Sequence, residues 1–151
     1  MTTQVQQRPL AELQQGRGMA AWVAMYQAYN AIFKRAELAI LSHGLSLPQL
    51  LVLAALRSAG EPMTIGHLAH AIVKETQTLT GLVDRLEDSG LVERAFDRSD
   101  RRKVWVRLTE AARQRFDEAL PVFRGSVETA LNGLSDEELG QVEASLQKVA
   151  S

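Results

Sequence analysis

The chain has 151 residues, 46% of them hydrophobic, which suits one compact domain with a helical extension. No apolar run approaches the roughly 20 residues that span a bilayer, and the opening MTTQVQQRPL has no signal-peptide pattern, so we expect a cytoplasmic protein with no membrane partner. Cysteine is absent, which excludes disulfide scaffolds, thiolate metal sites and thiol redox sensing.

The amino-terminal part of the chain predicts a polar tail followed by a long helix. Residues 1–17 are mostly polar, and we expect them to form a flexible segment. Over residues 18–44 apolar side chains recur at spacings of three and four, as in an amphipathic helix. The helix ends at His43-Gly44, because glycine readily takes the left-handed conformation found at helix carboxyl ends.

Three further helices are predicted by their caps and their apolar periodicity. Ser46 and Gln49 form the two halves of a capping box, and the helix that they begin runs to Gly60. Thr64 caps a short helix, and another spans roughly residues 76–89 with an apolar stripe along one side.

The second half of the chain predicts a hairpin and two more helices. Two short strands, near residues 91–94 and 103–108, flank a highly charged loop. Thr109 caps the next helix, and Ser135 with Glu138 forms the capping box of the last one. The middle of the chain therefore reads as three helices followed by a two-stranded hairpin.

Positive charge is concentrated in one part of the chain, although the net charge is only −1. Between Arg94 and Arg107 there are six lysines and arginines against two acids, whereas residues 108–151 hold four against eight. A local basic patch is typical of a surface that binds a polyanion. A charge run can also be no more than a solvated surface.

The order of these elements is that of a winged helix-turn-helix, so we expect a mainly α fold with a small β-hairpin wing. In this arrangement the helix before the hairpin enters the major groove of DNA. Its exposed side chains are short, amide-bearing or cationic, and suit base edges and phosphates. Those that we expect to contact DNA, besides the arginines of the loop, are Thr76, Gln77, Thr78, Thr80 and Arg85.

Five segments of the sequence together resemble one known family. They are LSLPQLLVLAAL (45–56), TIGHLAHAI (64–72), LTGLVDRLEDSGLVER (79–94), DRSDRRKVWVRLTEAA (97–112) and LSDEELGQVEASL (134–146). In order and spacing they resemble the MarR family of multiple-antibiotic-resistance-type repressors, over roughly residues 18–150.

The resemblance implies a homodimer that binds a pseudo-palindromic operator of double-stranded DNA. Residues 18–44 and 109–151 are expected to form an intertwined helical dimerisation region, and residues 45–108 the winged helix-turn-helix DNA-binding region. The same resemblance implies, as the leading interpretation, a repressor that a small ligand releases from the operator.

The family's wing residues match Asp97, Asp100, Arg101 and Arg102 of this chain. In the family pattern one arginine pairs with an acid and stiffens the hairpin, while another meets DNA. We expect Asp97 or Asp100 to hold Arg101. Arg98 and Arg102 are then expected to make the DNA contact, with Arg101 as a further DNA-binding candidate.

The resemblance also implies a pocket for a small aromatic or phenolic acid between the dimerisation and DNA-binding regions. Its candidate residues here are Trp22, Tyr26 and His43. An aromatic stripe on a helix is more often core, in this case dimer core. Urate is disfavoured as the ligand, because Leu51 stands where the urate-responsive subgroup carries an aspartate.

Two alternatives stay open at this stage. The hairpin could belong to a winged-helix module that binds another protein, and His67 and His70, three residues apart on one helix, could serve a metal-responsive regulator. No residue pattern suggests a catalytic site or a cofactor, so we do not expect an enzyme.

Overall fold

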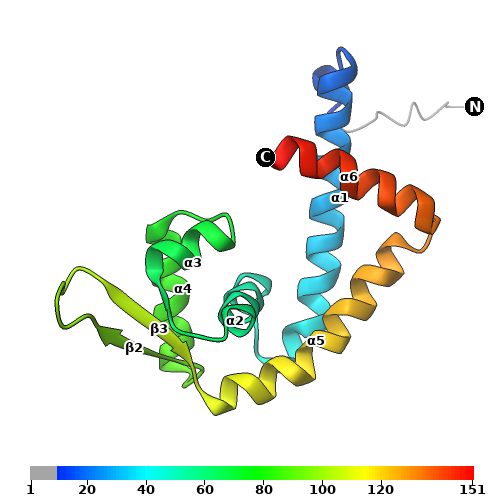
Figure 1. Ribbon diagram of the computed structural model, residues 1–151. Helices are drawn as coiled ribbons and strands as arrows, with labels where there is room; N and C mark the ends of the chain where they lie inside the picture. Colours follow the sequence, from blue (N-terminus) through cyan, green and yellow to red (C-terminus); the bar gives the residue numbers. More distant parts are fainter. Residues whose placement is uncertain (1–9) are drawn as a thin grey trace, which may run out of the picture.

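The computed structural model describes residues 10–151, and its elements follow the predicted order (Figure 1). They are η1 (Ala11–Leu13), α1 (Arg17–Ile40), η2 (Leu41–His43), α2 (Leu47–Ala59), β1 (Met63–Thr64), α3 (Ile65–Ala71), α4 (Thr76–Asp88), β2 (Val92–Phe96), β3 (Val104–Leu108), α5 (Glu110–Leu131) and α6 (Asp136–Ala150). The predicted fold class, mainly α with a small hairpin wing, is confirmed. Of the segment 1–17 expected to be flexible, residues 1–9 lie outside the described part of the chain.

The helix starts form where the sequence places hydrogen-bonding caps. Ser46 accepts a bond from the amide of Gln49, and the Gln49 side chain accepts one from the Ser46 amide at 2.9 Å. The same reciprocal pair joins Ser135 and Glu138 at the start of α6. Each capping box satisfies amides that the first helical turn would otherwise leave without a partner. These two predicted helix starts are confirmed.

The sheet of the described chain has three antiparallel strands in the order β1-β3-β2, where the sequence predicted two. The added strand β1 is only two residues long and pairs Thr64 with Trp105 of β3. Two residues are too few for the alternation of apolar and polar side chains that reveals a strand in a sequence. The hairpin β2–β3 pairs along its whole length, from Val92 opposite Leu108 to Phe96 opposite Val104.

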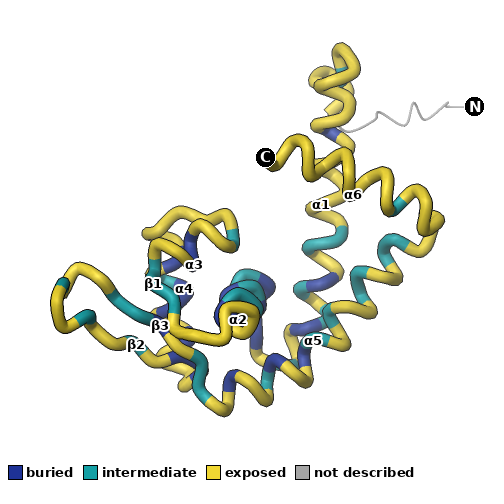
Figure 2. Tube along the Cα trace, viewed as in Figure 1, coloured by how far each residue is buried: buried dark blue, intermediate teal, exposed yellow. Residues whose placement is uncertain are grey.

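One hydrophobic core joins α2, α3, α4 and the sheet to the last turns of α1 and the first turns of α5 (Figure 2). Its fully buried large side chains come from α1, α2, α3, α4 and β2 and from the residues just before α2 and β2. They include Ile40, Leu45, Leu50, Leu53, Leu68, Leu79, Leu86 and Leu91. This core fixes α4 and the hairpin relative to each other, and so fixes the surface that they expose.

The long helices are packed much less completely than this lobe. α1 and α5 lie against each other, but α1 exposes Met19, Trp22, Tyr26 and Tyr29 between its start and its middle. Figure 2 shows α6 as almost entirely exposed, and none of its fully described residues is buried. Within residues 10–151, much of the apolar side of α6 and of the first turns of α1 is therefore uncovered.

Among the described residues, no single helix is both long and apolar enough to cross a bilayer. α1 and α2 reach that length and composition only when counted together, across a bend of 78°.

Candidate nucleic-acid interface

The helix α4 divides cleanly into a buried side and an exposed side. Its apolar stripe, Leu79, Leu82, Val83 and Leu86, is buried in the core. The residues predicted to contact DNA, Thr76, Gln77, Thr78, Thr80 and Arg85, are all exposed. The same helix thus anchors itself in the lobe and presents polar side chains from its first turns to solvent.

Arg94 of β2 fastens the hairpin to α4. Its guanidinium pairs with Asp84 and with Glu87, the latter at 3.2 Å, and also donates to the carbonyl of Thr80 at 3.4 Å. The Arg94 amide donates to Glu87 as well, at 3.2 Å. With a side chain only 22% exposed, Arg94 is screened from water more than its partners are. These contacts set the position of the wing relative to α4.

Asp97 organises the turn of the wing through four accepted hydrogen bonds. The donors are the amide and hydroxyl of Ser99, the amide of Asp100 and the indole Nε1 of Trp105, at distances from 2.6 to 3.2 Å. These bonds stabilise the charged carboxylate and hold the pKa of Asp97 well below its usual range, with the Ser99 hydroxyl the largest cause and Trp105 the next.

The prediction that Asp97 or Asp100 holds Arg101 is wrong. In the structure Arg102 is the arginine that pairs with Asp100. Arg102 Nε lies 3.1 Å from Asp100 Oδ1, and the Arg102 amide donates to the same oxygen at 3.0 Å. The turn directs the amide of Arg102 at Asp100, so the Arg102 side chain can donate a second bond to the same carboxylate. This contact lowers the pKa of Asp100. The acceptor positions of Asp97 are already filled by neutral donors.

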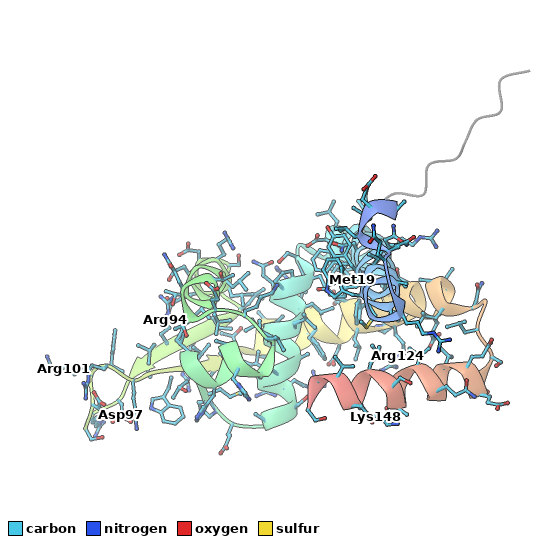
Figure 3. The ribbon with its side chains drawn as sticks, turned by 90° about the horizontal axis from the view of Figure 1, so that it is seen from above. Met19, Arg94, Asp97, Arg101, Arg124 and Lys148 are labelled. Atoms are coloured by element: carbon cyan, nitrogen blue, oxygen red, sulfur yellow. The ribbon has the colours of Figure 1, made fainter. Side chains whose placement is uncertain are left out.

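The remaining wing arginines, Arg98 and Arg101, are exposed. Within residues 10–151, Arg98 and Arg101 make no ion pair, and Figure 3 shows Asp97 and Arg101 at the tip of the wing with Arg94 nearer its base. The Arg102 side chain is 93% exposed even though its Nε bonds Asp100. Its two terminal nitrogens are therefore also available to an anion.

One surface hollow brings the helix and the wing together. It is lined by Thr76 and Thr80 of α4, by Thr64, Gly66 and His67 at the start of α3, and by Arg102, Lys103 and Trp105. Three of the residues predicted to contact DNA, Thr76, Thr80 and Arg102, thus border one concave surface. A polyanion lying there can be met by hydroxyls from one side and by cations from the other.

Comparison with known proteins supports the same interpretation. A model of the MarR family matches residues 43–103. The transcriptional repressor NicR of Pseudomonas putida is 34% identical over 110 residues, which cover 73% of this chain and 67% of NicR. A MarR-family transcriptional regulator from Silicibacter pomeroyi is 32% identical, with 94% of each chain covered and a TM-score of 0.72. The chain belongs to the MarR family.

Membership in the MarR family confirms the predicted transcriptional regulator and excludes the enzyme interpretation. A further solved relative is Bordetella bronchiseptica BpsR, whose DNA binding is regulated by 6-hydroxynicotinic acid. It is 26% identical to this chain, with a TM-score of 0.82 over 87% of this chain and 99% of BpsR. The chain spans about half the length of several curated relatives, 48% and 52% in two cases.

The residues predicted to line a ligand pocket are not brought together in one chain of this MarR-family protein. Trp22 and Tyr26 stack on each other on α1, with ring centroids 5.6 Å apart and planes at 13°. His43 lies beyond the other end of that helix, about 30 Å along its axis at 1.5 Å per residue. A pocket that contains both His43 and the two rings therefore cannot form within a single chain.

The two histidines of the metal-responsive alternative are exposed on α3. In the part of the chain that the structure describes, no three histidine, aspartate or glutamate side chains converge on a point that would suit a metal ion. His67 instead lines the hollow beside α4, and its amide is capped by Thr64.

Proposed function

We propose that this MarR-family regulator is a homodimeric repressor that binds a pseudo-palindromic operator and leaves it when a small aromatic or phenolic ligand binds. The observation that carries DNA binding is the exposed start of α4 beside a cationic wing. Both features are held in place by one core and by Arg94. A regulator of transcription acts where the chromosome is, so we place the protein in the cytoplasm.

In the proposed complex, α4 enters the major groove and the wing lies along the adjacent backbone and minor groove. Hydroxyl and amide side chains at its start bond base edges or phosphates, and the arginines neutralise phosphate charge. The proposed contacts are Thr76, Gln77, Thr78 and Thr80 from the first turns, and Arg85, Arg98, Arg101 and Arg102 as cations. Asp97 and Asp100 shape the wing that carries three of these arginines.

The dimer is proposed from the uncovered apolar sides of the long helices. Residues 18–44 and 109–151 would form the dimerisation region, and residues 45–108 the DNA-binding region. Two lobes related by a twofold axis then read half-sites about 34 Å apart, one turn of the double helix.

Ligand release is proposed from the aromatic surface of α1. Trp22 and Tyr26 offer a stacked pair of rings, and an aromatic acid suits such a surface when a cation or a histidine is near its carboxylate. Because His43 is distant within one chain, a site that uses all three residues requires the second chain of the dimer. The regulation of BpsR by 6-hydroxynicotinic acid makes this class of ligand the first to test.

The test of DNA binding is the salt dependence of affinity for a short labelled duplex. Arg101→Ala is expected to weaken binding and to reduce the slope of log affinity against log salt by about one. Arg124→Ala is the matched control, because Arg124 is an exposed arginine on α5, far from the wing (Figure 3), and should leave the slope unchanged. Equal slopes for both variants and the parent protein would sink the proposed wing contact.

The test of ligand release uses thermal shifts with a panel of aromatic and phenolic acids, including 6-hydroxynicotinic acid. A ligand that stabilises the protein should also reduce its affinity for the duplex, typically by a coupling of about 1–3 kcal/mol. Ligands that stabilise the protein without changing its DNA affinity argue against regulated release.

A further inference from the structure

Phe96 is a large apolar side chain exposed at the outer end of β2. It is 68% exposed, and β2 is an edge strand, since the sheet order is β1-β3-β2. Its cross-strand neighbour, Val104, is only half-buried and covers little of the ring. Single exposed apolar side chains are common on protein surfaces, so it is the surroundings of this ring that give its position significance.

The alternation of β2 fixes the side of the hairpin on which Phe96 lies. Successive side chains of a strand point to opposite faces, so Val92, Arg94 and Phe96 share one face. Val92 is buried in the core, and Arg94 reaches α4 through Asp84, Glu87 and the Thr80 carbonyl. That face is therefore turned toward α4, and Phe96 continues it outward to the part of the wing beyond the Arg94 contacts.

The immediate surroundings of the ring are cationic. Phe96 lines a second surface hollow together with Asp97, Arg98 and Arg101. The Asp97 carboxylate is occupied by Ser99, Asp100 and Trp105, while Arg98 and Arg101 make no ion pair within the described chain. The hollow thus presents one apolar ring beside two guanidinium groups, neither of which forms a direct ion pair with the Asp97 carboxylate.

An apolar ring beside two arginines favours nucleic acid over other polyanions as the partner of this hollow. The sugar-phosphate backbone alternates anionic phosphates with the apolar faces of deoxyribose, at a spacing that suits cations on either side of a ring. Proteins that contact the minor groove commonly add apolar side chains to their cationic ones. A surface that offers only carboxylates would pair with the arginines but would give the ring no apolar partner.

We propose that Phe96 packs on deoxyribose in the minor-groove wall of bound DNA, between phosphates held by Arg98 and Arg101. The inference rests on the proposed function, since it assumes that the wing binds DNA. It adds a contact of a different kind, because burial of an apolar ring releases no counterions and so gives affinity that does not depend on salt.

The experiment measures the affinity of three variants for a short fluorescein-labelled duplex of mixed sequence across a salt series. Phe96→Ala should bind about tenfold more weakly at every salt concentration with an unchanged salt slope, in line with losses seen when an aromatic contact to nucleic acid is removed. Phe96→Leu should recover most of the affinity, because it restores an apolar side chain. Arg101→Ala should instead reduce the slope by about one.

Light scattering and thermal melting on the same samples exclude other roles for the ring. Neither dimer mass nor melting temperature should change in Phe96→Ala. The inference is overturned if Phe96→Ala leaves the affinity unchanged or changes the salt slope. It is also overturned if a lower melting temperature accounts for the loss of affinity. An altered dimer mass with unaltered affinity assigns the ring to a protein contact instead. If the parent protein binds no duplex at any salt concentration, the proposed function itself fails. Binding by the parent with no effect of Phe96→Ala removes this inference alone.

Discussion

The helices α4 and α6 are similar in length and both carry an apolar stripe, yet the lobe buries one and leaves the other uncovered. α4 has 13 residues and buries four of them, Leu79, Leu82, Val83 and Leu86. α6 has 15 residues, all described, and buries none; its Val142 and Leu146 are 46% and 42% exposed. The stripe of α6 is uncovered in the single chain, and no element within residues 10–151 covers it.

The difference fits the separate roles proposed for the two helices. α4 uses its apolar side within the chain and is left with a polar side, which suits a ligand as hydrated and charged as DNA. α6 has its polar side in water and its apolar side without a partner, which suits a second copy of a similar helix. If this comparison is correct, damage to the two stripes must have different consequences.

The largest expected effect comes from charging the α6 stripe. Val142→Asp combined with Leu146→Asp should convert the protein to monomer, because two carboxylates would be buried without partners at the interface. Light scattering measures the change in mass. Ala144→Asp is the matched control, since it lies about 200° around the helix from Val142. A variant with both stripe substitutions that remains a dimer would remove α6 from the interface.

The next effect concerns the stripe of α4. Leu86→Ala should lower the free energy of unfolding by about 3 kcal/mol, because a fully buried leucine is replaced and the core cannot close the cavity. Urea denaturation measures it, with dimer mass expected to stay constant below the transition. Leu146→Ala on α6 should change the dissociation constant of the dimer instead, and equal behaviour of the two variants would contradict the comparison.

Loss of the Arg94 contacts should loosen the link between α4 and the wing. Arg94→Ala is expected to cost about 1–2 kcal/mol of stability, a modest value because its acidic partners are about half exposed and can be solvated. DNA affinity should fall with it. Arg107→Ala is the control on the opposite face of the hairpin, where an exposed pair with Glu93 is worth less than about 0.5 kcal/mol. Both are measured by urea denaturation and duplex binding.

A stabilising change is expected at Val73, in the turn between α3 and α4. Its φ is 54°, a left-handed conformation that costs a β-branched residue about 1–2 kcal/mol, and its side chain is 88% exposed. Val73→Gly should therefore raise the free energy of unfolding by about 1 kcal/mol after the entropy of glycine is subtracted. Val73→Ala keeps the strained Cβ and should gain much less. A destabilised glycine variant, seen in the same urea assay, would show that the side chain makes a contact that matters.

The smallest effect is the acid resistance of the wing turn. Hydrogen bonds from Ser99 and Trp105 lower the pKa of Asp97 below the value of about 4 that it has in an unfolded chain. Stabilisation by a lowered pKa is present above the unfolded value and is lost as the pH falls through the folded one. In a Trp22→Phe background, Trp105 fluorescence should therefore stay constant from neutral pH to about pH 4 and change only below it. Asp97→Asn should remove the transition, and a transition near neutral pH in the parent would contradict this assignment.

Local rules in the sequence were enough to place the helices. The boxes at Ser46 and Ser135 and the stripe of α4 are short-range patterns, and each identifies one element without knowledge of the rest of the fold. The exposure of the first turns of α4 follows from the stripe alone. The resemblance to the MarR family rested on the order of such segments, and membership of that family is confirmed.

Contacts between side chains of different elements could not be read in the same way. The Arg94 contacts depend on how β2 lies against α4, and the Trp105–Asp97 bond depends on the turn of the wing. The choice between Arg101 and Arg102 as the partner of Asp100 depends on the direction of one amide. Alternation of β2 offered one usable signal, since it places Arg94 on the same side as the buried Val92.

The wing is joined directly to α5, so a movement of this long helix is passed on to the wing. β3 ends at Leu108, Thr109 caps the next element, and α5 begins at Glu110, so there is no flexible loop between the wing and a helix of 22 residues. At 1.5 Å per residue that helix is about 33 Å long. Pro121 lies inside α5, but if the helix moved as one unit, a tilt of about 10° at its far end would displace the wing by about 6 Å, more than a base-pair step of about 3.4 Å along DNA. In the proposed complex with DNA, a small movement among the long helices would therefore change the register of the wing on the double helix.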